Sequence, residues 1–440
     1  MRRRSLLLVL CLGAGGCAAP SRLDLPRDDG LAPQLDALHH DGVSLSAPLD
    51  LRMVAILVLQ NNPDLRAVRL QAGVAQAQVI QAGILPNPSV TGSFLPLLAG
   101  FGSTPAWNAG ISEDLRALIT LHARTQAAQA GAAQVNAQIL WQEWQVVGRA
   151  WLLAVQIIEG ERTRRLLDQA RDLYAGRDAV SEQAMAQGNA TLSAVAPDRA
   201  ALQAAAAQSR SLEQLLLQHR HEIAALMGLV PDVPLPLAET TSILPEDANS
   251  ITAMLPTLGQ RRPDLIALQL GYRAENARLR AAILSRFPDL IFGVTGGSDN
   301  SNVRNIGPQM TLELPIFDRN QGNIAIEKAT RRQLHAEYSA RLAAAVGQVR
   351  AMLTEQALLR RQARMLEPEL AQARRDAATA TAALGAGDLD ERSAVELIAT
   401  EVSKEVERVA IEQSVLEQQV AIASLLGLGM RPVSPPEQGL

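Results

Sequence analysis

The 440-residue sequence has only two cysteines, Cys11 and Cys17, and both lie near its N-terminus. The rest of the chain therefore cannot form a disulfide bond or a cysteine-ligated metal site. Aromatic residues make up only 3% of the chain, which is too few for several ordinary globular cores. The net charge of −4 and a pI near 6.0 give no basic excess, so the composition does not indicate a nucleic-acid-binding protein.

The sequence also lacks an apolar run long enough to form a membrane-spanning helix. Its one short run, Leu6 to Leu12, follows three arginines and precedes small residues, which is the pattern of an export signal. Beyond this signal no long apolar segment exists. If the protein crosses a membrane, it must do so with strands.

Gly15-Gly16-Cys17 resembles a bacterial lipobox. The resemblance implies that residues 1–17 are a lipoprotein signal peptide and that Cys17 becomes the acylated (diacyl, palmitate-bearing) N-terminus. Ala14 departs from the pattern, which prefers leucine, and ordinary cleavage near Ala19 is the alternative. Ala18, in place of aspartate, resembles the signal for sorting to the outer membrane.

The sequence repeats itself after about 200 residues. Pro63-Asp64-Leu65 recurs as Pro263-Asp264-Leu265, and Ser193-Ala194-Val195 recurs as Ser393-Ala394-Val395. A nearly constant offset over this length indicates a tandem duplication. We expect an extended arm over 18–48, a first repeat over 49–229, a proline-rich connector over 230–256, a second repeat over 257–428 and a tail over 429–440.

Each repeat predicts the same order of elements. A helix ends at a proline, two strand candidates follow, and then two long helices run out and back. The strand candidates are 88–97 and 105–114 in the first repeat, and 288–297 and 305–314 in the second. The long helices are expected over 118–186 and to about Leu226, and then over 321–384 and 391–427. A continuous run over 118–186 would be about 100 Å long.

Residues 306–314 alternate between apolar and polar side chains, which is typical of a strand with one solvent-exposed face. Their polar face, together with that of the corresponding strand in the first repeat, predicts pore-lining residues: Gln309, Thr311, Glu313, Asn108 and Ser112. All five phenylalanines and Trp107 lie in or beside the strand candidates. This confinement favours a membrane-spanning sheet with interfacial aromatic residues over a soluble hairpin.

Four strands cannot close into a barrel, and an open edge in a bilayer leaves backbone groups without hydrogen bonds. Other copies of the chain must therefore complete the sheet, and three copies would supply twelve strands. The predicted fold class is an α+β membrane protein. Long, tandem-duplicated antiparallel helices would form an α-barrel, and four strands from each protomer would join a trimeric twelve-stranded β-barrel.

The sequence resembles the TolC-like outer-membrane efflux proteins over roughly residues 45–430. The residues that carry the resemblance are Asn61 to Leu65, Leu85 to Pro88, Arg261 to Leu265 and Leu314 to Gly322. The family implies a homotrimer in the outer membrane with a periplasmic helical tunnel, a periplasmic membrane-fusion adaptor and an inner-membrane pump. The Phe317 to Gly322 run resembles the heavy-metal efflux branch most, with drugs as the other substrate class.

The resemblance also points to the tips of the two long helical hairpins as the periplasmic entrance and the adaptor contact. The matching residues are Gly188, Leu192, Ser193, Val195, Gly387, Ser393 and Val395. Independently of this role, Gly188 and Gly387 permit turns at positive φ. A cluster of acids beside the second tip could form a cation-attracting ring around the aperture, or could simply favour a helix N-terminus. Its members are Asp388, Asp390, Glu391 and Glu396.

The histidines are scattered, so no protein metal site and no cofactor are predicted. No phosphate loop, H-E-x-x-H motif or nucleophile elbow occurs, so the chain is not expected to be an enzyme. The predicted function is the outer-membrane channel of a tripartite efflux system. The alternatives are a type I protein-secretion conduit and a lipid-anchored periplasmic coiled-coil structural protein.

Overall fold

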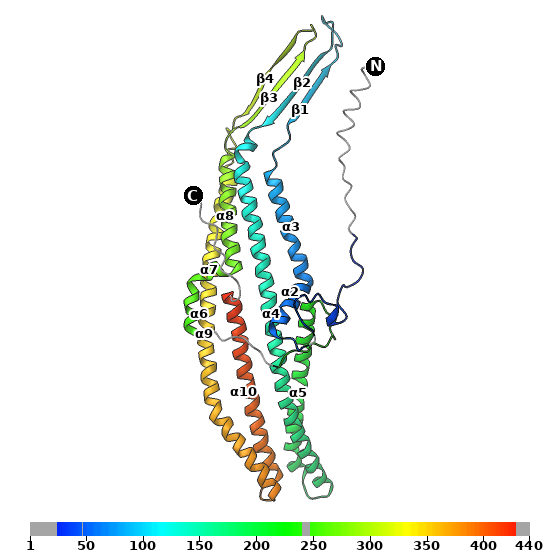
Figure 1. Ribbon diagram of the computed structural model, residues 1–440, viewed down its shortest axis with the longest axis vertical. Coiled ribbons are helices and arrows are strands. Elements are labelled where there is room, and N and C mark those ends of the chain that lie inside the picture. The colour runs from blue at the N-terminus through cyan, green and yellow to red at the C-terminus, as the bar shows by residue number, and fades with distance from the viewer. Residues whose placement is uncertain (1–23, 46, 240–246, 428–440) are drawn as a thin grey trace.

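The computed structural model describes residues 24–45, 47–239 and 247–427. The predicted signal peptide with Cys17, the C-terminal tail and the middle of the connector lie outside these residues. The described chain is long and narrow, with a small sheet at one end and four long helical arms at the other (Figure 1). Among the described residues, no helix combines the length and the apolarity needed to cross a bilayer.

The first repeat begins with two helices, α2 (Leu51–Asn61) and α3 (Pro63–Gly83). Asp50 caps α2 by accepting a hydrogen bond from the amide of Met53, and Asn62 caps α3 by accepting one from the amide of Leu65. Pro63 occupies the first position of α3, where its missing N–H costs nothing. The break between the helices therefore follows from their capping residues.

The remaining elements of the first repeat are β1 (Ser89–Leu95), β2 (Ala106–Asp114), α4 (Arg116–Ala186) and α5 (Leu192–Met227). In the second repeat, α8 (Pro263–Leu284) leads to β3 (Asp289–Ser298) and β4 (Arg304–Glu313). The long helices α9 (Gln321–Ala386) and α10 (Glu391–Leu426) follow. The four predicted strands and the long helices are confirmed, with boundaries shifted by a few residues.

Two segments expected to be irregular have more structure than predicted. The connector contains α6 (Ala248–Met254), and η2 (Leu255–Thr257) and α7 (Leu258–Arg261) follow it. The described part of the arm contains η1 (Leu35–Ala37) and buries Leu38 and Val43. The frequent prolines in both segments led to the prediction of irregular structure. The few apolar residues between the prolines pack onto the long helices and so order these segments.

The four strands form one antiparallel sheet in the order β1-β2-β3-β4. The two hairpins, although about 200 residues apart in the chain, therefore lie side by side through β2 and β3 (Figure 1). Strands β1 and β4 are the two edges of this sheet. Each of these edge strands pairs with a neighbouring strand on one side only, so the sheet is open.

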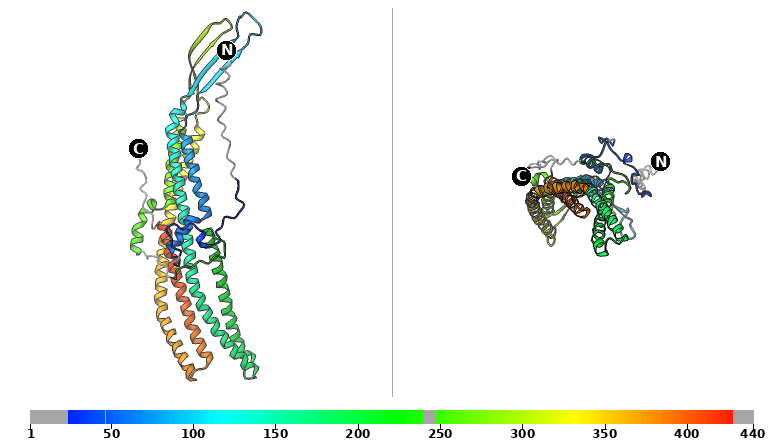
Figure 2. Two further views of the ribbon diagram at one scale, coloured as in Figure 1. Left: turned by 45° about the vertical axis from the view of Figure 1, so that its right-hand side comes forward. Right: turned by 90° about the horizontal axis from the view of Figure 1, so that it is seen from below.

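Below the sheet, the long helices form a curved wall, seen along its length in the right panel of Figure 2. In the lower half α9 packs on α10, α10 on α4, and α4 on α5; in the upper half α9 packs on α8, α8 on α4, and α4 on α3. Helix α4 therefore has neighbours on both sides along its length, whereas α9 and the α3/α5 pair form the two margins of the wall.

The apolar core is concentrated at the waist, in two clusters. The first joins the arm, α2, α4 and α5 and includes Leu57, Leu153, Ile223 and Met227. The second joins α6, α7, α8, α9 and α10 and includes Ile251, Leu258, Val349 and Leu426. Several members correspond across the repeat, such as Ile223 with Ile422 and Met227 with Leu426. The two repeats thus build equivalent cores around the same positions.

Candidate functional site: the two-faced sheet and the hairpin tips

The strand register divides the sheet into two chemically different faces. Residues paired across neighbouring strands lie on the same face. The register therefore defines rows of residues that cross all four strands on one face of the sheet. Ser89, Ser112, Gly293 and Gln309 make one such row. The next row on this face is Thr91, Gly110, Thr295 and Gly307, and a further row joins Ser93, Asn108, Gly297 and Asn305.

The opposite face is apolar and exposed. One row contains Val90, Ile111, Val294 and Pro308, and another contains Phe292 and Met310 together with Glu113. The exposed fractions of Val90, Ile306 and Met310 are 79%, 82% and 66%. An exposed, largely apolar surface of this kind marks an interaction with another protein or with a membrane.

Aromatic residues lie at both ends of the apolar face. Phe94 pairs directly with Trp107 near the hairpin turns, and both side chains are exposed. Near the helical end of the sheet, Phe287, Phe292 and Phe317 are exposed as well. Exposed aromatic residues thus lie near both ends of the sheet, as they do in membrane-spanning sheets.

The five residues predicted to line a pore all lie on the polar face. Gln309 shares a row with Ser112, and Thr311 and Glu313 follow along β4. Glu313 pairs across the strands with Asp289, which forms a salt bridge with Arg116. The side chain of Asn108 accepts a hydrogen bond from Thr295, at 3.1 Å. The structure thus brings all five onto one surface.

Glycines on the polar face allow the two hairpins to approach closely. A methyl group at Gly293 would lie 2.4 Å from the carbonyl oxygen of Ile111, and one at Gly297 would lie 2.5 Å from that of Trp107. Both contacts fall at the junction of β2 and β3. Crowding of Cβ positions on one face is expected on the inner side of a curved sheet, so these glycines favour the polar face as the concave one.

At the other end of the molecule, the hairpin tips turn at glycines. Gly188 and Gly387 have φ of +77° and +80°, a conformation that disfavours any residue with a Cβ. Leu192 is 65% exposed, and Ser193 is hydrogen-bonded to Thr191. By contrast, Val195 and Val395 are buried, so they pack within the protomer and leave surface contact to the other tip residues.

Two of the four acids beside the second tip have local side-chain partners. Asp390 caps α10 by accepting hydrogen bonds from the hydroxyl and the amide of Ser393, at 2.6 and 3.0 Å. These bonds lower the pKa of Asp390. Glu396 lies 3.8 Å from Arg177. The capping role is therefore present for Asp390, while Asp388 and Glu391 stay exposed.

An ion-pair network above the tips was not foreseen from the sequence. The guanidinium of Arg177, on α4, donates to the carboxylate of Asp198, on α5, and both side chains are only 7% exposed. Ser181 and Arg392 also donate to Asp198, at 2.6 and 3.0 Å. Burial would raise the pKa of Asp198, but these three donors outweigh it and hold the pKa below its ordinary value.

The network joins the two hairpins. Arg177 donates to the backbone carbonyl of Arg392 at 3.1 Å, and Arg392 donates to that of Ala194 at the same distance. The partners of Arg177 lie 21 and 215 residues away, so the spacing alone could not identify them.

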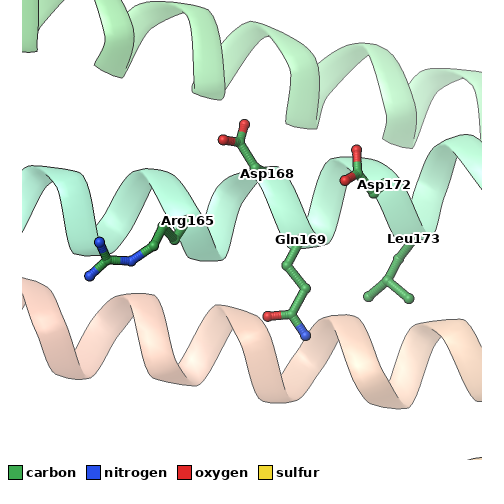
Figure 3. Close-up of a pocket in the computed structure, with 5 residues that line it drawn as sticks. All are labelled: Arg165, Asp168, Gln169, Asp172 and Leu173. Atoms are coloured by element: carbon green, nitrogen blue, oxygen red, sulfur yellow. The ribbon is translucent and has the colours of Figure 1, made fainter.

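Between the waist and the tips, an open groove runs along α4, with α5 on one side and α10 on the other (Figure 3). Asp168 and Asp172 point toward α5, whereas Arg165, Gln169 and Leu173 point toward α10. Ser209 of α5 donates to Asp168 at 2.9 Å. The polar lining shows no convergence of catalytic groups, and no cluster of three or more metal-ligating side chains occurs in the described parts of the chain.

Comparison with known proteins identifies the class to which this architecture belongs. Residues 254–428 match the family described as outer membrane efflux protein. The chain also has the fold of solved outer-membrane channels. None of the curated proteins matches the chain.

Three solved structures illustrate the likeness. CusC, described in terms of folding and transmembrane channel formation, is 19% identical with a TM-score of 0.69, and the match covers 94% of this chain and 100% of that one. A membrane protein from Pseudomonas aeruginosa is 20% identical with a TM-score of 0.72, covering 94% and 98%. The open state of the Neisseria gonorrhoeae MtrE outer membrane channel is 17% identical with a TM-score of 0.69, covering 94% and 98%.

Proposed function

We propose that this chain forms the outer-membrane channel of a tripartite efflux system, as a homotrimer. Three copies would join their sheets edge to edge, β4 of one to β1 of the next, into a barrel of twelve strands. The helical walls would close into a periplasmic tunnel below it. The single observation that carries this proposal is the two-faced sheet, with its apolar face exposed between aromatic residues and its glycine-crowded face polar.

The open margins of the protomer support the trimer. An unpaired strand edge must be covered in a bilayer, because each unsatisfied backbone group there costs several kcal/mol. Strands β1 and β4 are both such edges. The margin helix α3 also exposes Leu70, Val74 and Ile80 at 75%, 61% and 62%. A neighbouring copy would cover the strand edges and the helical margins together.

We further propose that the hairpin tips contact a periplasmic adaptor, which links the channel to an inner-membrane pump. The exposed Leu192 and the glycine turns at Gly188 and Gly387 support this role. Asp388, Asp390, Glu391 and Glu396 would then stand near the aperture. A planar-bilayer recording of the double variant Asp388→Ala, Asp390→Ala tests this ring: unchanged conductance and cation selectivity would contradict it.

For the substrate we propose heavy-metal cations or drugs. The Phe317 to Gly322 run favours metals, and the carboxylate of Glu313 on the polar face would attract cations. Deleting the gene and measuring sensitivity to metals, dyes and antibiotics separates these classes. A loss of protein export instead would favour a secretion conduit.

Adjacent residues of β4 test the pore directly. Because the chain beyond Cys17 has no cysteine, Thr311→Cys and Met310→Cys each introduce one new thiol, on opposite faces of one strand. In proteoliposomes, we expect a charged, water-soluble thiol reagent to modify Thr311→Cys and reduce the single-channel current. Met310→Cys, which would face lipid, should react at least tenfold more slowly and leave the current unchanged.

The opposite result would contradict the assignment of the faces. Equal reaction at both positions, with no current in any variant, would favour the lipid-anchored coiled-coil alternative. Chemical cross-linking in detergent gives an independent measure of the trimer, which the structural alternative does not require.

A further inference from the structure

The loop between β1 and β2, residues 96–105, presents two large apolar side chains at the end of the molecule opposite the helical tips (Figure 1). Leu98 is 94% exposed, and Phe101 is fully exposed. Both lie beyond the last residue pair of the two strands, Leu95 with Ala106. The proposed trimer would cover the strand edges and the helical margins, so this loop needs a separate explanation.

The neighbouring turn holds the loop in a defined position. The amide of Ser103 donates a hydrogen bond to the backbone carbonyl of Asn300, in the β3–β4 turn, at 3.0 Å. That turn is itself fixed, because the carboxylate of Asp299 accepts hydrogen bonds from the amides of Ser301 and Val303, at 2.8 and 2.9 Å. The two apolar side chains are therefore presented from a backbone that is tied to the second hairpin.

Within the loop, one leucine packs and the two outermost apolar side chains do not. A methyl group at Gly102 would lie 3.1 Å from Cδ2 of Leu97 and 3.0 Å from Cβ of Asn300. Leu97 thus folds back over the glycine, beside the turn. Leu98 and Phe101 have no such cover. Adjacent apolar side chains that a fixed backbone leaves uncovered mark an interaction site.

The absence of charge indicates what covers this site. No Asp, Glu, Lys, Arg or His occurs between Arg69 and Glu113. The turn of the second hairpin, by contrast, has Asp299 within it and Arg304 directly after it. A charged side chain is costly in the hydrocarbon region of a bilayer, and an uncharged loop avoids this cost. The composition of the first hairpin therefore favours lipid as the covering phase.

The apolar strand face of the first hairpin is also short. It runs from the row of Val90 and Ile111 to the row of Phe94 and Trp107, which is two steps of two residues. Glu113 occupies the next position on this face towards the helices, so the face ends there. With about 3.3 Å per residue and a strand tilt of about 40°, two steps give about 10 Å of height. The apolar band of an outer-membrane barrel is about 25 Å tall.

Leu98 and Phe101 extend the apolar surface at the turn end of the sheet. Leu98 follows Phe94 by four residues, so the two lie within about 14 Å of each other. In the second hairpin, the row of Phe94 contains Ser298 and Arg304 instead, and the apolar face ends. The loop thus lengthens the apolar surface of the hairpin whose strands provide less of it.

We propose that the 96–105 loop enters the boundary of the lipid bilayer, where Leu98 and Phe101 contact acyl chains and anchor the turn end of the first hairpin. Lipid, and not a second copy of the chain or another protein, covers this surface. The polar turn of the second hairpin remains among headgroups or in water. This inference rests on the proposed function, because it requires the sheet to lie in a membrane, and it adds a lipid contact beyond the strands.

The test attaches a fluorescent nitrobenzoxadiazole label to single cysteines in the full-length protein. Leu98→Cys and Phe101→Cys probe the loop, Ser301→Cys is the matched control in the polar turn, and Met310→Cys reports on the strand face. All four positions are exposed, so the substitutions should leave folding intact. The proteoliposomes contain phosphatidylcholine spin-labelled on its acyl chain near the headgroup. We expect this lipid to quench at least half of the fluorescence of both loop labels, and little of that at Ser301→Cys.

The label at Met310→Cys separates failure of this inference from failure of the proposed function. If it is quenched and the loop labels are not, the sheet lies in the membrane but the loop does not, and the inference is overturned alone. If no label is quenched, the proposed function fails as well. Disulfide-linked chains formed on oxidation of Phe101→Cys would assign the surface to a second copy. Equal quenching at Ser301→Cys would contradict the difference between the two turns.

Discussion

The two repeats share one plan, but their waists are covered to different extents. In the first, α2 is a single helix and the arm packs over it, so Leu153 of α4 is fully buried. In the second, Pro256 interrupts the corresponding segment, which becomes α6, η2 and α7. Leu353 of α9, the counterpart of Leu153, is only partly buried. The duplication thus gave both repeats the same arrangement of helices. The segments that cover these helices bury the first core more completely than the second.

The same position can also be stabilised by different chemistry. Asn62 caps α3 through its side chain and donates to the carbonyl of Leu226 at 2.9 Å. Its counterpart, Arg262, instead forms a buried, two-bonded ion pair with Asp264 and lies 4.9 Å above the ring of Trp141. The helix begins at the equivalent proline in both cases. The two repeats therefore share the position of the helix break before the proline, but different interactions stabilise it.

The largest effect is expected at the two leucines of the waist. Leu153→Ala should lower the free energy of unfolding by about 3–5 kcal/mol, because it leaves a cavity in a fully enclosed core. Leu353→Ala should cost about 1–2 kcal/mol, since its site is partly open and can be filled by solvent or by relaxation. Urea unfolding in detergent measures both. Equal costs would show that the assembled protein encloses the second core as fully as the first.

The ion-pair network above the tips should have an intermediate effect. Arg177→Ala leaves the Asp198 carboxylate buried without its main donor, so we expect a loss of about 2–3 kcal/mol at pH 7. The second repeat has Ala377 and Ile398 at the equivalent positions, which shows that an apolar contact also suits this geometry. Arg171→Ala, which removes two ion pairs of a partly exposed arginine on the same helix, is the control and should cost little.

The pH dependence of this loss gives a second measurement. Because the folded-state pKa of Asp198 lies below its ordinary 3.8, the stability that it contributes is present above that value and is lost as the pH falls through the folded pKa. The difference between the native protein and Arg177→Ala should therefore shrink below about pH 4. A constant difference down to pH 3 would assign the loss to packing by the arginine chain.

The smallest effects, and the most equal ones, are expected at the ends of the return helices. Gly228 and Gly427 end α5 and α10 at φ of +70° and +65°. An added methyl group would lie 3.1 Å from the carbonyl oxygen of Asn61 in one case and 3.2 Å from that of Arg261 in the other. Each glycine-to-alanine variant should cost about 1–2 kcal/mol. A large difference between them would mean that the two repeats no longer share this joint.

The sequence determined the elements of this protein to a large extent. Period-two alternation located the strands, and glycine or proline marked most ends of the long helices, because these signals depend on local backbone geometry. The duplication identified equivalent positions in the two repeats without any structure. The assignment of Gln309, Thr311 and Glu313 to one face of β4 followed from alternation alone.

Only the tertiary structure decided how distant residues meet. It paired β2 with β3, which placed Ser112 and Gln309 in one row. It also joined Arg177 to Asp198 and Arg392. Each of these contacts crosses between helices or hairpins, so its energy depends on packing and on the local dielectric. A local sequence pattern carries no information about either, and for this reason the buried charge cluster around Asp198 could not be predicted from the sequence.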